Sequence, residues 1–288
     1  MLHRFEAKLR QTIMCASYEL RTKRQAIQEL GIPVPETLAE DALGIVVRGY
    51  RKTDKAPVVV FENGRRALKE MCFSLCPRWS GEFPFRAATY NARMNRPKTD
   101  KKTGKPIRHP RTGRPLMEYI FEMPAWKASF RDRHCLVPMS LAMEYSYFGA
   151  YAGNMVRFSK RDGALFLAIG IWDRWLQRDT GESVDSFAIL TDDPYPFFYD
   201  SGHRRSLFVI SENHWDAWLT GKFASPKDSY EFLRKNRIDL DWKAEIERPM
   251  RKGWEKRAPN PDEIEAIGAA VWRGAVGSEE RAFGSSRQ

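Results

Sequence analysis

Short apolar runs recur through the middle of the chain, each bounded by Gly, Asp or Pro. Three of them are "ALFLAIGIW", "SFAILT" and "SLFVIS". Their length and their β-branched and aromatic content are typical of strands. A fourth run, in "APVVVFENGRRALKEMCFSL", reaches Asn63-Gly64, the dipeptide that tight hairpin turns favour. The pattern therefore predicts a hairpin here and further strands downstream.

Helix signals flank these strands. In "TKRQAIQELG", Thr22 and Gln25 fit a capping box and Gly31 fits a helix stop. "SENHWDAWLTG" is predicted to be a helix capped by Ser211, and "SPKDSYEFLRKN" a second helix with Pro226 in its first turn. "PDEIEAIGAAVWRGA" predicts one more helix near the C-terminal end.

The order of these elements predicts the fold class. Strands dominate the middle of the chain, helices flank them, and strands do not alternate regularly with helices. We expect an α+β single domain with a mainly antiparallel, barrel-like β core and flanking helices. Within it we expect buried thiols at Cys72 and Cys76. Five tryptophans are expected in the core rather than as platforms for bases: Trp79, Trp172, Trp175, Trp215 and Trp218.

Composition limits the cellular setting. The 288 residues are 42% hydrophobic, enough for one sizeable core. No apolar run approaches the roughly 18 residues of a membrane span, and the N-terminal residues lack the apolar region of a secretory signal. The four cysteines form neither a CxxC pair nor a zinc-type cluster with histidine. We expect a cytoplasmic monomer without a metal, a cofactor or a membrane partner.

Charge indicates an anionic partner. The chain holds 48 Lys and Arg against 37 Asp and Glu, a formal net charge of +11. Residues 96–115, "RPKTDKKTGKPIRHPRTGRP", carry a local net charge of +7, and Gly and Pro interrupt them. They are predicted to form a loop or loose hairpin inserted between core elements. We expect phosphate contacts from Lys98, Lys101, Lys102 and Lys105.

Several common enzyme classes lack their motif in this chain, which has no Gly-x-Ser-x-Gly, P-loop, GxGxxG or HExxH. Four other stretches remain, in the order "MCASYELR", "YNARMNRP", "RHCLVPMSLAMEYSYF" and "DSGHRRSLFVISENHWDAWL". Together they resemble the SOS response-associated peptidase (SRAP) family, whose members crosslink to abasic sites in single-stranded DNA. The matching order runs over roughly residues 14–220.

The resemblance is motif by motif. Met14-Cys15 stands where the family begins Met-Cys-Gly-Arg, and "NARMN" stands for its "NARAE". "CFSLCPRW" is similar to its "RWGLVPSW", "RHCLVPMSLAMEY" to its "RRCLVPASGFYEW", and "GIWD" to its "GLWE". Departures include Ala16 and Ser17 in place of Gly-Arg, and Arg204 in place of an Asp. The resemblance therefore implies a divergent member.

The resemblance also assigns roles. The α-amine of an N-terminal Cys15 would form a Schiff base with the aldehyde of the abasic sugar, and its thiol would close a thiazolidine. Glu144 would move protons during imine formation, and His203 would act as acid and base at the sugar hydroxyl. Asn91 would hold the cysteine by hydrogen bonds. In addition, Arg93 and Arg205 would bind phosphates beside the lesion.

This chemistry needs a free α-amine, which the Met14–Cys15 peptide bond blocks. Either translation starts at Met14, which we favour, or residues 1–14 are a pro-segment that Cys15 itself releases by the peptidase activity of the family name. We therefore divide the chain into an extension (1–14), an SRAP-like domain (15–250) with its basic insert, and a tail (251–288) that is partly disordered.

Two other functions stay open at this point. A cysteine peptidase acting on other proteins would need a Cys–His pair with an oxyanion hole. A non-catalytic single-stranded DNA-binding protein would need only basic grooves and aromatic side chains. The expected partner in the leading interpretation is single-stranded DNA that contains abasic sites.

Overall fold

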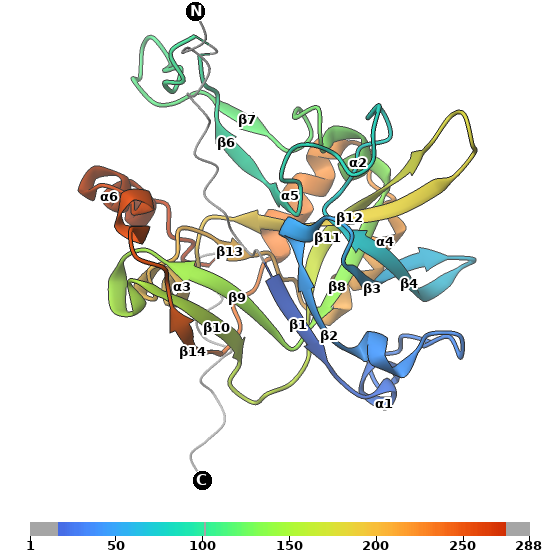
Figure 1. The fold of residues 1–288 in the computed structure, drawn as a ribbon. Helices are drawn as coiled ribbons and strands as arrows, with labels where there is room; N and C mark the ends of the chain where they lie inside the picture. The colour runs from blue at the N-terminus through green and yellow to red at the C-terminus, as the bar shows by residue number, and fades with distance from the viewer. Residues whose placement is uncertain (1–16, 101, 275–288) are drawn as a thin grey trace, which may run out of the picture.

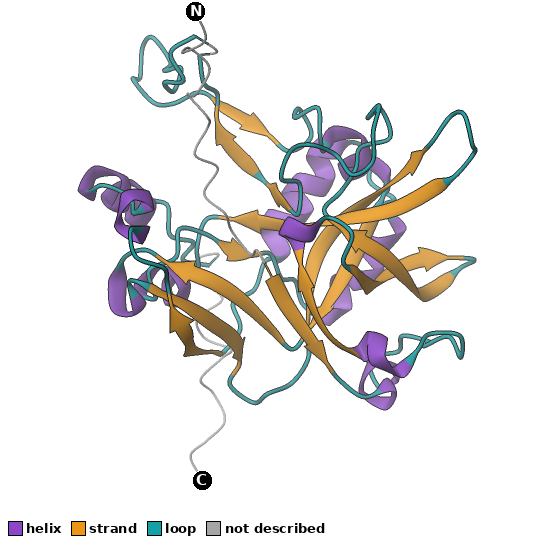
Figure 2. Ribbon diagram, viewed as in Figure 1, coloured by secondary structure: helices purple, strands orange, loops and turns teal. Residues whose placement is uncertain are grey.

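A computed structural model describes residues 17–100 and 102–274, and its core consists of two sheets (Figure 1, Figure 2). The smaller sheet has five strands, and each neighbouring pair is antiparallel. In spatial order they are β14 (Trp242–Pro249), β10 (Asn154–Lys160), β9 (Leu141–Ser146), β1 (Ser17–Arg21) and β2 (Gly44–Arg48). This sheet carries the first described residue, Ser17, in a central strand.

The larger sheet closes on itself. Its spatial order is β11 (Phe166–Leu176), β8 (His134–Met139), β3 (Lys55–Glu62), β4 (Arg65–Phe73), β12 (Ser183–Asp192) and β13 (Ser206–Leu207), with β5 (Asn91–Arg93) also on β12. Because β12 pairs with β11 as well as with β4, the first five strands form a barrel-like ring. The pairs of β12 with β4 and β5 are parallel, and the others are antiparallel.

Alternate side chains of the larger sheet enter two different cores. On β12, Phe187 and Ile189 join a cluster shared with the smaller sheet, whereas Ala188 and Leu190 join a cluster under the helices. This is the two-residue period of a strand buried on both faces, and it explains why the strand segments are continuously apolar. Three helices cover the second cluster: α2 (Lys127–Asp132), α4 (Trp215–Thr220) and α5 (Pro226–Asn236).

The remaining elements are short. A two-stranded ribbon, β6 (Asn95–Pro97) with β7 (Met117–Tyr119), carries the basic insert away from the body (Figure 1). The other helices are α1 (Arg24–Gln28), α3 (Pro196–Asp200) and α6 (Pro261–Ala269). Single 3₁₀ turns occupy Glu40–Leu43, Gly49–Arg51, Gly149–Tyr151, Glu212–His214 and Trp254–Arg257. In the described part of the chain, no helix is long and apolar enough to cross a membrane.

The α+β fold class and its mainly antiparallel sheets are confirmed. The predicted hairpin is β3–β4, and both of its turn residues, Asn63 and Gly64, have positive φ, as the tight turn requires. The helix from Pro226 is also confirmed, because the Ser225 side chain accepts a hydrogen bond from the Asp228 amide.

Two predictions about local structure are wrong. The first helix begins at Arg24 after Lys23, which makes no side-chain cap. Thr22 donates to the Lys23 carbonyl instead, and Gln25 bonds Glu29, so no capping box forms. Ser211 likewise makes no side-chain cap and bonds Asn213, and a 3₁₀ turn precedes α4.

The tryptophans divide differently from the expectation. Trp175, Trp215 and Trp218 are buried and Trp172 is partly buried, but Trp79 is 54% exposed and is not a core residue. The indole of Trp79 lies edge-on to Phe85 and donates to the Pro124 carbonyl, so an exposed ring is held in a fixed orientation. The predicted tail helix is α6, and beyond it Trp272 packs on Tyr195.

Gly202, in the loop before β13, lies against the backbone of Phe148, which follows β9. It has a φ of +87°, and a Cβ there would overlap the Phe148 carbonyl oxygen. Gly163, with a φ of +72°, has open space around the same position. The backbone strain is therefore similar at the two glycines, but only Gly202 adds a steric clash.

We expect Gly163→Ala to lower the free energy of unfolding by about 1 kcal/mol, which is the cost of a left-handed alanine. Gly202→Ala should cost more than about 3 kcal/mol, because the Phe148 backbone must also move. Urea unfolding of both variants measures the difference. Equal losses would show that the close approach at Gly202 is not a constraint.

Candidate active site

A buried carboxylate and a buried imidazole meet at the end of β9. Glu144 and His203 are each 3% exposed, and Glu144 Oε2 lies 3.1 Å from His203 Nε2. On β9 the neighbouring residue Met143 belongs to a small apolar cluster on the other face of the sheet. Strand alternation therefore turns Glu144 toward the interior, where a carboxylate occurs only when it has a partner.

The hydrogen bonds of His203 define where its protons lie. Nδ1 is 2.6 Å from the Arg205 carbonyl oxygen, which can only accept, so Nδ1 carries a hydrogen. Close contact between Nε2 and Glu144 then requires one further proton between them. A carboxylate and an imidazole in direct contact form the arrangement that general acid–base catalysis uses.

The loop that carries His203 is fixed to β9 by backbone hydrogen bonds. Tyr147 donates to the Gly202 carbonyl at 3.1 Å, and the Ser146 hydroxyl donates to the Ser201 carbonyl. His203 itself donates from its backbone to Phe198 in α3 at 2.8 Å. Because both members of the acid–base pair are held by this framework, their spacing is set before any ligand arrives.

Asn91 presents an unsatisfied amide on β5. Its Oδ1 and Nδ2 are both buried, and neither has a hydrogen-bond partner among residues 17–100 and 102–274. Ala92, its neighbour, is fully buried in the core under the helices, so Asn91 and Arg93 face the opposite side of the strand. A buried amide without partners costs about 1–3 kcal/mol of stability. Both atoms of this amide are therefore available to form hydrogen bonds with a ligand.

Three arginines gather beside His203. Arg93 interacts electrostatically with both Arg204 and Arg205, which connects β5 to the His203 loop. Burial, together with repulsion from Arg204 and Arg96, lowers the pKa of Arg93 to about 10, so it stays charged at neutral pH. The Nε atoms of Arg204 and Arg205 are buried without a partner in the described part of the chain. This cluster suits an anion.

Two acidic residues at the end of β12 interact electrostatically with members of this cluster. Asp192, 1% exposed at the end of β12, pairs with Arg234 and Arg237. Burial raises the pKa of the adjacent Asp193, and so does its neighbour Asp192. Arg205 donates to the Thr191 carbonyl and is 7% exposed. Arg205 therefore supports the strand end as well as contributing charge.

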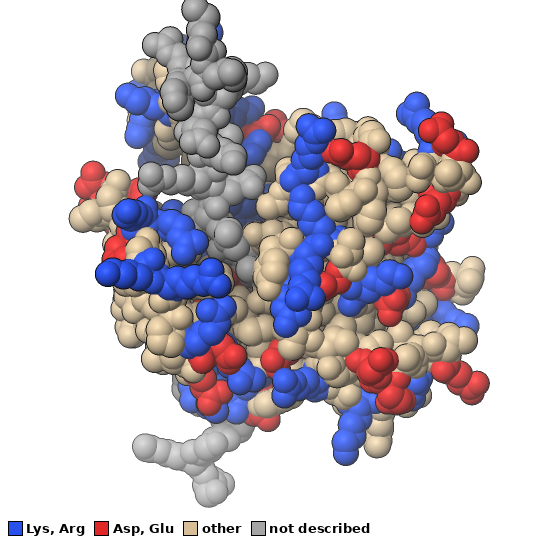
Figure 3. All heavy atoms as spheres, viewed as in Figure 1, with Lys and Arg blue, Asp and Glu red and all other residues tan. Residues whose placement is uncertain are grey.

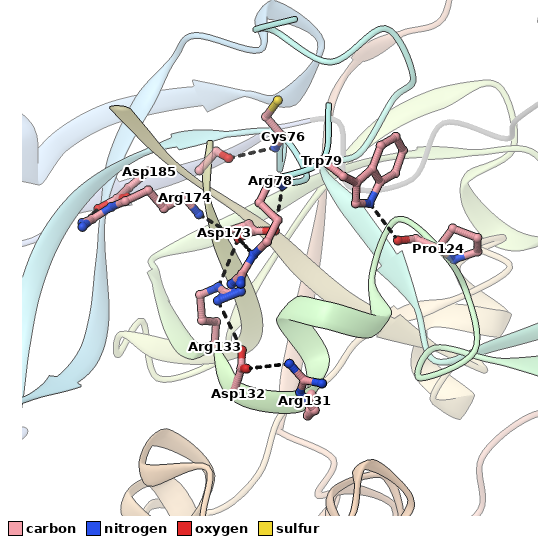
Figure 4. Close-up of polar contacts among 11 residues, drawn as sticks. Cys76, Arg78, Trp79, Pro124, Arg131, Asp132, Arg133, Asp173, Arg174 and Asp185 are labelled. Carbon is pink, nitrogen blue, oxygen red and sulfur yellow. Dashed lines mark hydrogen bonds and ion pairs between the residues drawn. The ribbon is translucent and has the colours of Figure 1, made fainter. Parts of the chain in front are cut away.

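The segment between β4 and β5 is anchored at Asp173 (Figure 4). This carboxylate is 1% exposed and accepts hydrogen bonds from the backbone and Nε of Arg78 and from Nε of Arg133. Arg78 precedes the exposed Trp79, and Figure 4 shows the Trp79 indole directed toward Pro124. Arg78, Arg133 and Arg174 also line an open pocket beside Trp172. Asp173 thus fixes the route of the chain toward Asn91.

The structure brings together Glu144 and His203, and it brings Arg93 beside Arg205. Asn91 lies on the Arg93 face of β5. Cys15 and Lys101 lie outside the described residues, and Lys98, Lys102 and Lys105 lie in the basic insert beyond β6. In the described ranges, no group of three or more His, Cys, Asp or Glu could hold a metal ion.

Sequence reasoning missed two residues of this region. Arg204 was noted only as a departure from the family motif, although its place directly after His203 indicated a basic cluster. Trp79 was expected in the core. Its signal was the neighbouring "CPRWSGEFP", whose Pro, Ser and Gly content is typical of a surface loop.

The fold and the site define an α+β protein with an acid–base pair beside an arginine cluster and an unsatisfied asparagine. We compared the chain with models of protein families. The family model described as SOS response associated peptidase (SRAP) matches residues 108–245. The match covers a little less than half of the chain, and over these residues the chain is similar to this family. The description of that family model names the SOS response.

Solved structures agree with the fold. A protein from Bacteroides thetaiotaomicron is 20% identical, with a TM-score of 0.59 over 87% of this chain and 99% of its own. A protein from Bordetella bronchiseptica is 18% identical, with a TM-score of 0.55 over 81% and 99%. A phage-related protein of the same bacterium is 15% identical, with a TM-score of 0.52 over 81% and 93%. No curated protein matches the chain.

Asp173→Asn tests the anchor of the β4–β5 segment. The amide keeps the shape but leaves Arg78 and Arg133 without their buried counter-charge, which should lower the free energy of unfolding by about 3 kcal/mol or more. Glu82→Gln is the matched control, because it breaks an exposed pair with Arg86 and should cost less than about 0.5 kcal/mol. Denaturant unfolding reports both values, and similar losses would rule out the anchoring role.

Proposed function

We propose that this protein senses abasic sites in single-stranded DNA and captures them covalently through an N-terminal Cys15. The observation that carries the proposal is the buried Glu144–His203 pair, with the unsatisfied amide of Asn91 and the arginine cluster around it. The match to the SRAP family model supports a role at abasic sites. The covalent step and the roles below are our own inference.

Chain connectivity supports a cysteine at this place. Ser17, in β1, lies opposite Met143, the residue before Glu144. Cys15 precedes Ser17 by two residues, and two residues span at most about 7 Å. In this proposal a nucleophile at position 15 would act within that span of Ser17.

The proposed reaction is balanced without any oxidant or reductant. The ring-opened abasic sugar presents an aldehyde, and the neutral α-amine of Cys15 adds to it. Glu144, in its protonated state, gives a proton to the departing hydroxyl, so that water leaves, and the proton on the resulting iminium nitrogen returns to Glu144 to give the imine. The Cys15 thiol then adds to the imine carbon, and its proton ends on the nitrogen. The product is a thiazolidine plus one water molecule.

The amino acid types suit each step. An unperturbed α-amine has a pKa of about 7.7–8.0, so a useful fraction is neutral near neutral pH, whereas a lysine at about 10.4 would be almost fully charged. Asn91 can offer its amide to the backbone or amine of the cysteine. Arg93 and Arg205 would bind phosphates beside the lesion, and Arg204 lies in the same cluster. His203 would act as acid and base at the sugar hydroxyl.

Exposure of the α-amine is a required part of this proposal. The preceding residues are absent if translation starts at Met14 and that methionine is removed. Alternatively, Cys15 releases residues 1–14 itself, which would be the peptidase step. Both routes give the same reactive terminus.

Three versions of the protein distinguish these routes: one that starts at Met14, the full chain, and the full chain with Cys15→Ala. We expect the first to give a denaturation-resistant band with an abasic oligonucleotide. The full chain should do so only to the extent that its intact mass shows loss of residues 1–14. If that loss is absent from Cys15→Ala, it is self-processing. A chain that crosslinks while it still carries Met1 contradicts the N-terminal-cysteine mechanism.

Glu144→Gln should slow crosslinking by about 100-fold, because an amide cannot deliver a proton, while its shape preserves the packing. His203→Ala should affect reversal of the crosslink more than its formation. Rates come from quenched time points on a denaturing gel, with the version that starts at Met14 as parent. Glu231→Gln, on the surface of α5, is the control. Parent rates in both site variants would show that the assigned roles are wrong.

A further inference from the structure

The basic insert contains a nine-residue repeat. "KTGKPI" (102–107) and "RTGRPL" (111–116) align position by position as basic, Thr, Gly, basic, Pro and aliphatic. The composition of residues 96–115 alone does not indicate this order. The question is whether the two copies also share one conformation.

The backbone hydrogen bonds show that they do. Gly104 donates to the Asp100 carbonyl at 2.8 Å, and Gly113 donates to the His109 carbonyl at 2.9 Å. The return bonds also match, from Asp100 to Lys105 at 2.9 Å and from His109 to Arg114 at 2.8 Å. The two glycines have nearly equal φ values, +69° and +66°. The insert is therefore two copies of one turn.

The same position caps each turn with a side chain. Asp100 Oδ1 accepts hydrogen bonds from the backbones of Lys102 and Thr103, and His109 Nδ1 accepts from Arg111 and Thr112. Each cap occupies the first position of its turn. Both turns consequently present their two basic side chains from equivalent backbone positions.

The two turns are joined into one rigid unit. Ile107 donates to Lys98, Leu116 donates to Ile107, and Lys98 donates to Leu116, so that three chain segments bond in a closed set. Isolated bridges pair Thr99 with Pro106 and Arg108 with Pro115. We call residues 98–116 the basic arm.

The base of the arm is fixed to the body beside the candidate site. Arg96 pairs with Glu118 at 2.7 Å across β6 and β7. Tyr119 stacks on Phe121 and lies edge-on to Tyr230 of α5. Because β6 follows β5 after a single residue, the arm extends in a set direction from the strand that carries Asn91 and Arg93.

The four basic side chains of the two repeat copies make no ion pair within the described residues, whereas Lys98 at the base of the arm pairs with Glu122. Lys102, Lys105, Arg111 and Arg114 are all exposed, and none forms an ion pair with another described residue. In the space-filling view, Lys and Arg side chains stand out on the arm (Figure 3). An exposed surface of one sign at a fixed place fits a polyanion.

We propose that the basic arm is a two-site clamp for the phosphate backbone of the DNA that flanks the lesion, with each turn gripping it through an equivalent pair of basic side chains. The statement that the bound DNA flanks a lesion rests on the proposed function. The grip itself needs no abasic site and no Cys15. Binding of intact DNA therefore tests the arm independently of the crosslink.

The experiment compares two double variants, Lys102→Gln with Lys105→Gln and Arg111→Gln with Arg114→Gln, and their combination. The control is Lys222→Gln with Lys227→Gln, two exposed lysines near α4 and α5. Binding of a long single strand without an abasic site is measured from about 50 to 200 mM salt. Circular dichroism confirms that each variant is folded.

Each double variant should reduce the slope of log K against log salt by about 1.4, since each neutralised phosphate contributes about 0.7 on a single strand. The combination should reduce it by about 2.8, and the control should leave it unchanged. An oligonucleotide too short to extend from the candidate active site to the arm should show no effect of the arm variants.

Three results would overturn the proposal: slopes equal to that of the parent, a loss confined to one of the two turns, or the same loss on the short oligonucleotide. A failure of the proposed function looks different. In that case the salt slopes respond as expected, but no covalent product forms with an abasic oligonucleotide.

Discussion

The hydrogen bonds of β12 support the other parts of the molecule. This strand pairs with β11 and β4, which closes the ring of the larger sheet. It also pairs with β5, which carries Asn91, and with β13, which follows the loop that carries His203. Its side chains fill both cores in alternation. A change that displaces β12 would therefore disturb the packing and the site together, because they share one backbone.

Electrostatics at the end of β12 follow from this arrangement. The strand ends at two adjacent aspartates in a buried setting, and four arginines converge on them: Arg93, Arg205, Arg234 and Arg237. Arg237 also lies over the rings of Tyr195, Phe208 and Trp272. Arginines that are paired with carboxylates and stacked on rings in this way tolerate burial. Arg93 and Arg204 form no such ion pair with a described residue, so their guanidinium groups can bind an anion.

The sequence predicted what depends on near neighbours. The β3–β4 turn needs positive φ at two adjacent residues, and Asn63-Gly64 supplies both. The helix from Pro226 is specified by the residue before it. The parallel pairing of β12 with β4 and β5 could not be predicted in this way, since it joins segments about a hundred residues apart and depends on packing. Local rules also failed at Thr22, because a hydroxyl can bond the next carbonyl instead of the helix.

The site was predictable only in part. Glu144 and His203 are ordinary residues in a strand and a loop, and only their place in ordered family motifs singled them out. Their direct contact required the fold, and so did the orphaned amide of Asn91. Trp79 was misplaced because aromatic residues are more often buried than held on a surface by an anchored loop.

The pairing of β1 has a consequence for biosynthesis. Ser17 to Glu19 bond β9, whose residues lie more than a hundred positions later, and the Arg21 amide bonds Ser140. A chain emerging from the ribosome cannot place β1 against its inner neighbour until β9 has been made, and His203 follows later still. The acid–base pair is therefore completed only after most of the domain has been synthesised, so a truncated nascent chain carries no assembled centre.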